Sequence, residues 1–174
     1  VERSKNGTFL FKRAYMDYHA DRFNDISLIC RAKERVVALL PANIDGVTVH
    51  SHQGLSYGGF VTSAAMTTPL MSDVVIAALD WLRKFGAERM IYKTVPHIYH
   101  QQTAEEDRFV LFRLGAKLHR RDVLSVIDNS AVSSIQSRRR RGAKRAAKAG
   151  LEVSESDNVH SFWPILERRL QRAH

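Results

Sequence analysis

One short segment of the chain gathers side chains that can bind anions and transfer protons. The string MIYKTVPHIYH begins apolar and then carries Lys93, His97, Tyr99 and His100. A lysine pairs with carboxylates or phosphates, and a histidine exchanges protons near neutral pH. Because ligand clefts of α/β proteins open at the carboxyl ends of strands, we predict that Lys93, His97 and Tyr99 bind substrate. The alternative is that Pro96 only bends the chain and leaves the others as surface groups.

The tripeptide Tyr57-Gly58-Gly59 is a second candidate for substrate binding. Glycine has no Cβ, so its backbone lets a substrate approach closely, and Tyr57 would form a hydrogen-bonding wall beside it. The two glycines could equally serve a turn that only the path of the chain requires. The residue types leave both explanations open.

Three consecutive acids, Glu105, Glu106 and Asp107, are candidates for a general base. A carboxylate can take a proton from an attacking amine, directly or through water. The acids also begin a predicted helix, where a capping box from Thr103 to Glu106 and the helix dipole account for them. The second explanation is favoured, so the sequence designates no catalytic residue.

His50 and His52 form a His-x-His pattern on a predicted strand. Alternate residues of a strand face the same side, so this pair would be half of a metal site. The pattern places no third ligand beside them, and the single cysteine, Cys30, argues against a zinc site built on thiolates. We therefore expect no metal.

Residues 134–150 hold seven cations and no acid, which is +7 of the net charge of +9. We predict a helix here, with Arg138, Arg139, Arg141 and Lys144 binding phosphate groups. The phosphates could belong to nucleic acid, to anionic lipid or to a phosphorylated ligand. A helix face that is merely solvated is the commonest explanation of such a run, and the run has no aromatic residue for base stacking.

The hydrophobic pattern predicts an α/β fold with a mixed, mainly antiparallel sheet flanked by helices. The expected elements are strands at 26–31, 35–41 and 47–51 in an antiparallel meander, a loop over 53–70, a helix over 73–85 capped by Ser72, a strand at 89–92, a helix over 103–114, a strand pair or one bent strand within 116–128, the basic helix capped by Ser133, a strand at 151–154, and a helix from Pro164 to about residue 172.

Composition narrows the class of protein further. The chain has 174 residues, of which 44% are hydrophobic and 26% charged, so it is not disordered throughout. No apolar run approaches the roughly 20 residues of a membrane span, and the first residues contain no apolar signal segment. A lone cysteine excludes a disulfide within the chain. These features predict a cytoplasmic protein.

The order of elements is that of the acyl-CoA N-acyltransferase (GNAT) fold, and particular strings sharpen the likeness. From Ser4 to Leu170 the chain resembles Fem-type (FemAB-like) acyltransferases, the two-lobed branch of that superfamily. The strings that carry the resemblance are SKNGTFLFKRAYMDYHADRFNDISL, LLPANIDG, HSHQGLSYGGF, MIYKTVPHIYH and AEEDRFVLFRLGA for the first lobe, and RRRRGAKRAAKAGLEV for the opening of the second. Residues 1–130 would be the first GNAT-like lobe, and 131–174 a truncated start of the second, made of the basic helix, a strand and a helix.

The resemblance implies transfer of an acyl or aminoacyl group to an amine, for example on a cell-envelope or polysaccharide precursor. The donor would be an acyl-CoA or an aminoacyl-tRNA, so the expected partners are an amine-bearing acceptor and tRNA, with a homodimer as an open option. Asn6, Arg13 and Arg22 would face the cleft between lobes, and this piece alone is expected to be inactive. Neither Gly54–Gly59 nor residues 139–144 have the spacing of the loop that binds the CoA pyrophosphate in GNAT enzymes. The alternative function is a non-catalytic nucleic-acid-binding module that uses the basic helix.

Overall fold

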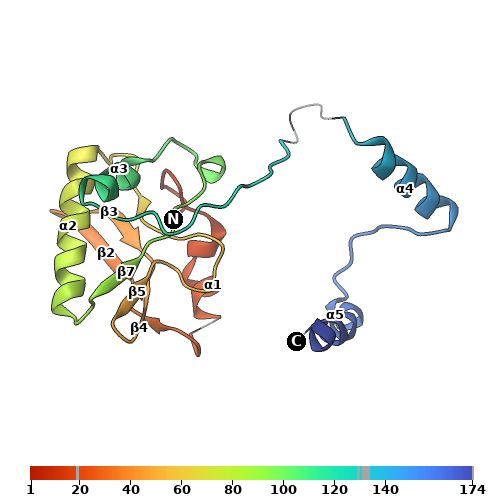
Figure 1. Cartoon of the computed structure of the whole chain (residues 1–174), viewed down its shortest axis with the longest axis horizontal. Coiled ribbons are helices and arrows are strands. Elements are labelled where there is room, and N and C mark those ends of the chain that lie inside the picture. The colour runs from red at the N-terminus through yellow and green to blue at the C-terminus, as the bar shows by residue number, and fades with distance from the viewer. Residues whose placement is uncertain (19, 129, 131–133, 174) are drawn as a thin grey trace. The chain divides into compact units, whose positions relative to one another are not determined.

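A computed structural model describes residues 1–18, 20–128, 130 and 134–173. The chain divides into two compact units, Val1–Arg121 and Asp122–His174. Each unit is described by itself, and Figure 1 labels the elements of both. Ser133, the predicted cap of the basic helix, lies outside the described residues.

The first unit is mixed α/β, which confirms the predicted fold class. Its elements are η1 (Phe9–Phe11), α1 (Arg13–Asp17), β1 (Asn24–Asp25), β2 (Leu28–Ala32), β3 (Arg35–Leu40), β4 (Asn43–Asp45), β5 (Thr48–His50), β6 (Val61–Thr62), α2 (Thr68–Lys84), β7 (Arg89–Ile91), η2 (His97–Tyr99) and α3 (Glu106–Arg113).

The described strands form two sheets, where the sequence predicted one meander. One sheet has the order β1-β4-β5-β7 and the other β2-β3-β6, and every pair is antiparallel except β5 with β7. The sequence pattern also predicts a turn over residues 43–46, with Asp45-Gly46 as its signal, but residues 43–45 form strand β4. The chain leaves the β2–β3 ladder at Pro41, which has no N–H to donate, and the backbone of Ala42 bonds to Ile26 and Ser27.

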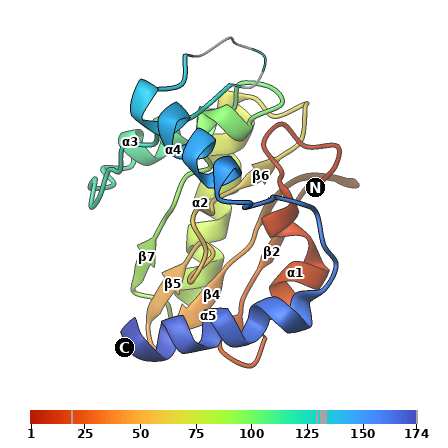
Figure 2. The ribbon, with the colours of Figure 1, turned by 90° about the vertical axis from the view of Figure 1, so that its right-hand side faces the viewer.

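Helix α2 covers the strands and forms the main core with them. Figures 1 and 2 show it running along the strands, with α3 packed near one end. It begins at Thr68 rather than near Ser72, because the Thr67 hydroxyl accepts a hydrogen bond from the N–H of Leu70 and Pro69 suits the first turn. Its buried residues are Met71, Val74, Val75, Ala78 and Leu82.

Helix α3 begins without the capping box predicted from Thr103. No side chain caps it, and the Glu106 carboxylate instead accepts a hydrogen bond from Nζ of Lys5, which also donates to the Met66 carbonyl at 3.0 Å. Both partners of this ion pair are largely buried. The Glu106 side chain, which the sequence pattern assigned to a capping box, therefore forms an ion pair with the distant Lys5 instead.

The second unit contains α4 (Ser137–Lys148) and α5 (Val159–Ala173). The strand predicted at 151–154 is absent, and so is the strand pair within 116–128; both segments lie among the described residues, are exposed and have no regular structure. An extended segment needs a neighbouring strand to satisfy its backbone, and neither segment has one there. Helix α5 begins five residues before Pro164, after Asn158, whose Oδ1 accepts the Ser161 N–H at 3.2 Å.

Candidate functional site

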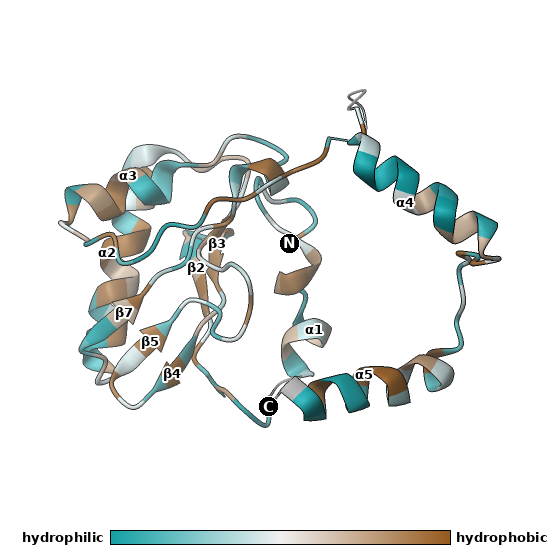
Figure 3. Cartoon of the chain, turned by 45° about the vertical axis from the view of Figure 1, so that its right-hand side comes forward, coloured by the Kyte–Doolittle hydropathy of each residue, from teal (hydrophilic) through white to brown (hydrophobic). Residues whose placement is uncertain are grey.

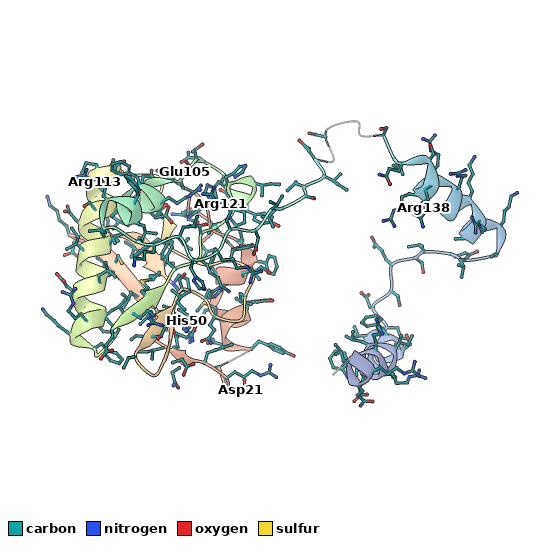
Figure 4. The ribbon with its side chains drawn as sticks, viewed as in Figure 1. Asp21, His50, Glu105, Arg113, Arg121 and Arg138 are labelled. Carbon is teal, nitrogen blue, oxygen red and sulfur yellow. The ribbon has the colours of Figure 1, made fainter. Side chains whose placement is uncertain are left out.

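The loop of residues 51–60 connects β5 with β6 and carries several predicted site residues. Figure 4 labels His50, the last residue of β5, from which the loop departs. Many of its polar groups have partners: the Ser51 hydroxyl accepts the Lys93 N–H at 2.7 Å, and the Gln53 N–H donates to Oδ1 of Asn43 at 3.1 Å. The loop is therefore fixed by its neighbours despite its irregular shape.

The two glycines of this loop are explained by close packing. A Cβ on Gly58 would lie 2.0 Å from the carbonyl oxygen of Ser51, and a Cβ on Gly59 would lie 2.6 Å from that of Lys93. Gly59 also has a φ of +97°, which side-chain-bearing residues rarely adopt. Chain geometry alone is thus sufficient to require both glycines.

Tyr57 is a core residue. It is 8% exposed, and its hydroxyl donates to Oγ1 of Thr8 at 2.9 Å. Its ring packs against Phe11 and against Tyr99, with centroids 5.9 and 5.2 Å apart. Tyr99 is half exposed. The structure therefore brings the predicted Tyr57 and Tyr99 together, but with Tyr57 largely covered.

Lys93 lies beside the same loop, whereas His97 is exposed in η2. Nζ of Lys93 donates to the carbonyl of Leu55, so the ammonium ties down the loop. Burial lowers the pKa of Lys93, and the nearby Arg120 charge lowers it further. The two predicted residues therefore do not form one site: Lys93 anchors the loop, and His97 lies on the surface.

A small pocket is lined in part by residues of the same loop. Its volume is about 50 Å³, enough for a few waters or the end of a small ligand. Its walls combine aromatic, apolar and polar side chains: Arg13, Tyr15, Met16, Ala20, Phe23, Asp25, Ala42, Asn43, His52, Gln53 and Leu55. All of them belong to the first unit.

His52 is the unusual member of this pocket. It is 5% exposed and has a φ of +66°, which is uncommon for a residue other than glycine. Its ring packs on Phe11, with centroids 5.2 Å apart. Within the described chain, neither ring nitrogen has a hydrogen-bond partner, and the Tyr57 backbone lies near the ring but outside hydrogen-bonding geometry. A buried polar group without a partner is rare and calls for an explanation.

The electrostatics of the pocket keep His52 neutral near pH 7. Burial lowers its pKa below the usual 6.5; the nearby Tyr57 backbone opposes this shift, Lys93 adds to it, and Asp25 opposes it. Burial alone would raise the pKa of Asp25, but hydrogen bonds from Ser27 and Arg13 bring it below the ordinary value. The pocket therefore combines an unprotonated imidazole with an ionised carboxylate, and it can accept a proton.

The sequence did not single out this site. His52 was considered only with His50, as two side chains on one face of a strand. Strand β5 ends at His50, and the positive φ of His52 turns the next residues into the loop. Of the three residues expected to face a cleft between lobes, Arg13 lines the pocket, Arg22 is exposed outside it, and Asn6 is buried and donates to the Phe60 carbonyl. The backbone turn that places His52 has no signature in the residue types.

The acidic triplet has structural partners, but they differ from the capping box that the sequence favoured. Glu106 pairs with Lys5, and Glu105 pairs with Arg108 on the helix surface. Asp107 is buried and accepts a hydrogen bond from the Tyr92 hydroxyl. Burial raises the pKa of Asp107, although this hydrogen bond and neighbouring charges oppose the shift.

In the second unit, Arg138, Arg139, Arg141 and Lys144 all lie on α4 and are exposed. Figure 4 labels Arg138 in the first turn of this helix. Neither these residues nor the other cations of α4 form an ion pair within the described part of the chain. They remain available to an external anion.

Comparison with protein-family models, with curated proteins and with solved structures gives no match. Across the described residues, no helix is both long and apolar enough to span a membrane. No group of three or more histidine, cysteine, aspartate or glutamate residues is arranged to hold a metal ion in that same part of the chain. The pocket at His52 and the cations of α4 are the features from which a function can be argued.

Proposed function

We propose that the protein is an N-acyltransferase of the Fem type, with the pocket of the first unit receiving the acceptor amine. The observation that carries this proposal is His52, a buried histidine in a pocket with both ring nitrogens unpartnered and a lowered pKa. Acyl transfer to an amine needs a general base, and an unprotonated imidazole can serve as one. The resemblance to Fem-type enzymes supplies the reaction class, and the pocket supplies a group that can serve it.

The chemistry is direct attack. The amine nitrogen forms a bond to the acyl carbonyl carbon, the bond from that carbon to the donor's leaving group breaks, and His52 takes the proton that the amine loses. The leaving group is the CoA thiolate or a ribose oxygen of tRNA, and it is protonated in turn. Asp25 favours the positive charge that forms on His52, because its carboxylate raises the tendency of this imidazole to protonate. No covalent enzyme intermediate is required.

Several finer assignments belong to the same proposal. The acceptor is an amine on a cell-envelope or polysaccharide precursor, and the reaction takes place in the cytoplasm, where acyl-CoA and aminoacyl-tRNA are available. Tyr99, which packs on Tyr57, and Lys93, which donates to the Leu55 carbonyl, hold the loop and do not line the pocket. His52 is the residue assigned to proton transfer.

The test is an acyl-transfer assay on the native gene product, whose intact mass first establishes whether a second lobe accompanies this chain. Acyl-CoA and aminoacyl-tRNA are offered separately with amine acceptors, and mass spectrometry detects the amide. Replacing His52→Asn removes the base but suits the positive φ, so kcat should fall about 10²- to 10⁴-fold. His50→Gln is the matched control and should retain activity. If neither donor class is consumed, the acyl-transfer proposal fails; if H52N keeps full activity, the assignment of His52 fails.

A further inference from the structure

Helix α4 presents its cations mainly on one side. At 100° per residue, Arg138, Arg140, Arg141, Lys144, Arg145 and Lys148 fall within an arc of about 160°. Arg139 lies on the opposite side. We call the six residues the cationic face of α4. The four-residue set predicted from the sequence therefore contains three members of this face and one outlier.

The side opposite the cationic face is made of small residues. Gly142, Ala143, Ala146 and Ala147 share it with Arg139. Figure 3 shows α4 as hydrophilic segments alternating with paler ones, in contrast to the strongly hydrophobic segments of α5. A helix that inserts into a bilayer surface carries tryptophan, phenylalanine or leucine on its apolar side. Because α4 has none of these, its charge favours a soluble polyanion over a lipid surface.

Within the described residues, no carboxylate balances the charges of the cationic face. Pairs such as Arg140 with Lys144, and Arg141 with Arg145, stand four residues apart and repel each other. The helix contains no acid, and within the described residues none of the six cations pairs with a carboxylate. A bound polyanion would remove this repulsion.

The dimensions of the face suit an extended array of phosphates. From Arg138 to Lys148 it runs about 15 Å along the helix axis. A nucleic-acid duplex carries one charge per roughly 1.7 Å, or about nine over that length. A single pyrophosphate would engage only part of such a row. Since α4 has no aromatic residue to stack on bases, contact with the backbone alone is expected.

We propose that the cationic face of α4 binds the phosphodiester backbone of double-stranded nucleic acid without reading its sequence, and that Arg139 takes no part. This inference does not depend on the acyl-transfer proposal, because it concerns the second unit and needs neither a donor nor the pocket at His52.

The experiment measures binding of the full chain to a short fluorescein-labelled duplex by anisotropy, between about 0.05 and 0.2 M salt. If all six cations contact phosphates, the slope of log Kd against log salt is about 5. Arg141→Gln removes one contact, which should lower the slope by about 0.9 and weaken binding roughly tenfold at the lowest salt. Arg139→Gln removes the same charge from the opposite side and should leave Kd within about twofold. Glutamine and arginine have similar helix propensities, so both variants keep the helix, which far-UV circular dichroism checks.

Three results would overturn the inference. Equal loss of affinity in R139Q and R141Q would mean that only net charge matters. Absence of duplex binding by the parent chain at the lowest salt would rule out the interface. Binding to phosphatidylserine–phosphatidylcholine vesicles that is tighter than duplex binding, and that R141Q weakens, would identify a membrane surface as the partner. All of these measurements omit acyl donors, so their outcome is separate from that of the acyl-transfer assay.

Discussion

Loop 51–60 and helix α4 place polar residues in opposite ways. The loop has no regular secondary structure, yet it is buried in large part and tied to the N-terminal segment, to β4 and to the chain after β7. Helix α4 is regular, yet its side chains are nearly all exposed and its cations lack carboxylate partners among the described residues. Regular secondary structure and a fixed environment are thus separate properties in this protein.

The difference determines what each region can do. His52 is one group held in one place, with a pKa moved by burial, and such a group can act in a chemical step. The cationic face of α4 acts through the number of its charges in water, so it gives binding that salt weakens. Substitutions of the same type should therefore have very different effects in the two regions.

The largest difference is expected for glycine-to-alanine exchanges. In Gly58→Ala the new methyl group would meet the Ser51 carbonyl oxygen at 2.0 Å, so the loop must shift, and we expect a loss of about 3 kcal/mol in the free energy of unfolding. Gly142→Ala meets nothing within 4 Å and replaces a poor helix former, so it should stabilise α4 by about 1 kcal/mol. Urea unfolding measures the first change, and circular dichroism measures the helicity gained in the second. A Gly58→Ala protein with parental stability would show that the loop is not packed as described.

A similar contrast is expected when one positive charge is removed from each unit. Lys5→Met leaves the Glu106 carboxylate largely buried without its partner, and this should cost about 3 kcal/mol. The double variant K5M/E106L removes both charges and should recover most of that loss. Arg141→Gln removes an exposed charge and should change the stability by less than about 0.5 kcal/mol. Equal effects of K5M and R141Q in urea unfolding would contradict the buried ion pair.

These contrasts also explain which parts of the structure the sequence could predict. Hydrophobic periodicity predicted most of α2 and the strands β2, β3, β5 and β7, because local patterning determines such elements. The basic run at 134–150 predicted the helix α4. It misplaced the start of α2, since Thr67 and Pro69 also form a sound helix start. It predicted a turn over residues 43–46, because Asp45-Gly46 does mark the turn between β4 and β5, and it missed the short strand β4 before that turn. At 116–128 and 151–154 it predicted strands from apolar content, but a strand also needs a partner strand.

The candidate site was harder to predict than the fold. Tyr57, Gly58 and Gly59 were recognised as special, but the partners of Tyr57 and Gly59 lie far away in the sequence, at Thr8 and Lys93. His52 was seen only as half of a His-x-His pattern. Its burial and its positive φ result from tertiary packing, which residue types do not encode. The positions of charges on α4, by contrast, follow from helical periodicity, which puts Arg139 on the side opposite the other six cations.

A smaller effect should appear in the dependence of stability on pH. Because burial lowers the pKa of His52, the unfolded chain takes up a proton near pH 6.5 before the folded chain does. Stability should therefore fall as the pH drops through 6.5 and continue to fall until the folded imidazole is also protonated. In H52N this component should vanish, whereas the exposed His160 of α5 offers a control, and H160Q should keep the parental profile. Chemical unfolding at a series of pH values measures the difference, and identical profiles for H52N and the parent would rule out a buried neutral imidazole.

The smallest effect concerns the helicity of α4 in salt. Each repulsive pair of cations three or four residues apart disfavours the helix by about 0.2–0.5 kcal/mol, and salt weakens this repulsion as the Debye length falls from about 30 Å at 0.01 M to about 3 Å at 1 M. Circular dichroism of the chain should therefore show helicity rising with salt. Arg141 has cations at positions 138, 144 and 145, so R141Q should reduce the rise, whereas Arg139 has Gly142 and Ala143 at these spacings, so R139Q should not. A loss of helicity in salt would mean that partners outside the helix already neutralise these cations, and α4 would then resemble loop 51–60 rather than contrast with it.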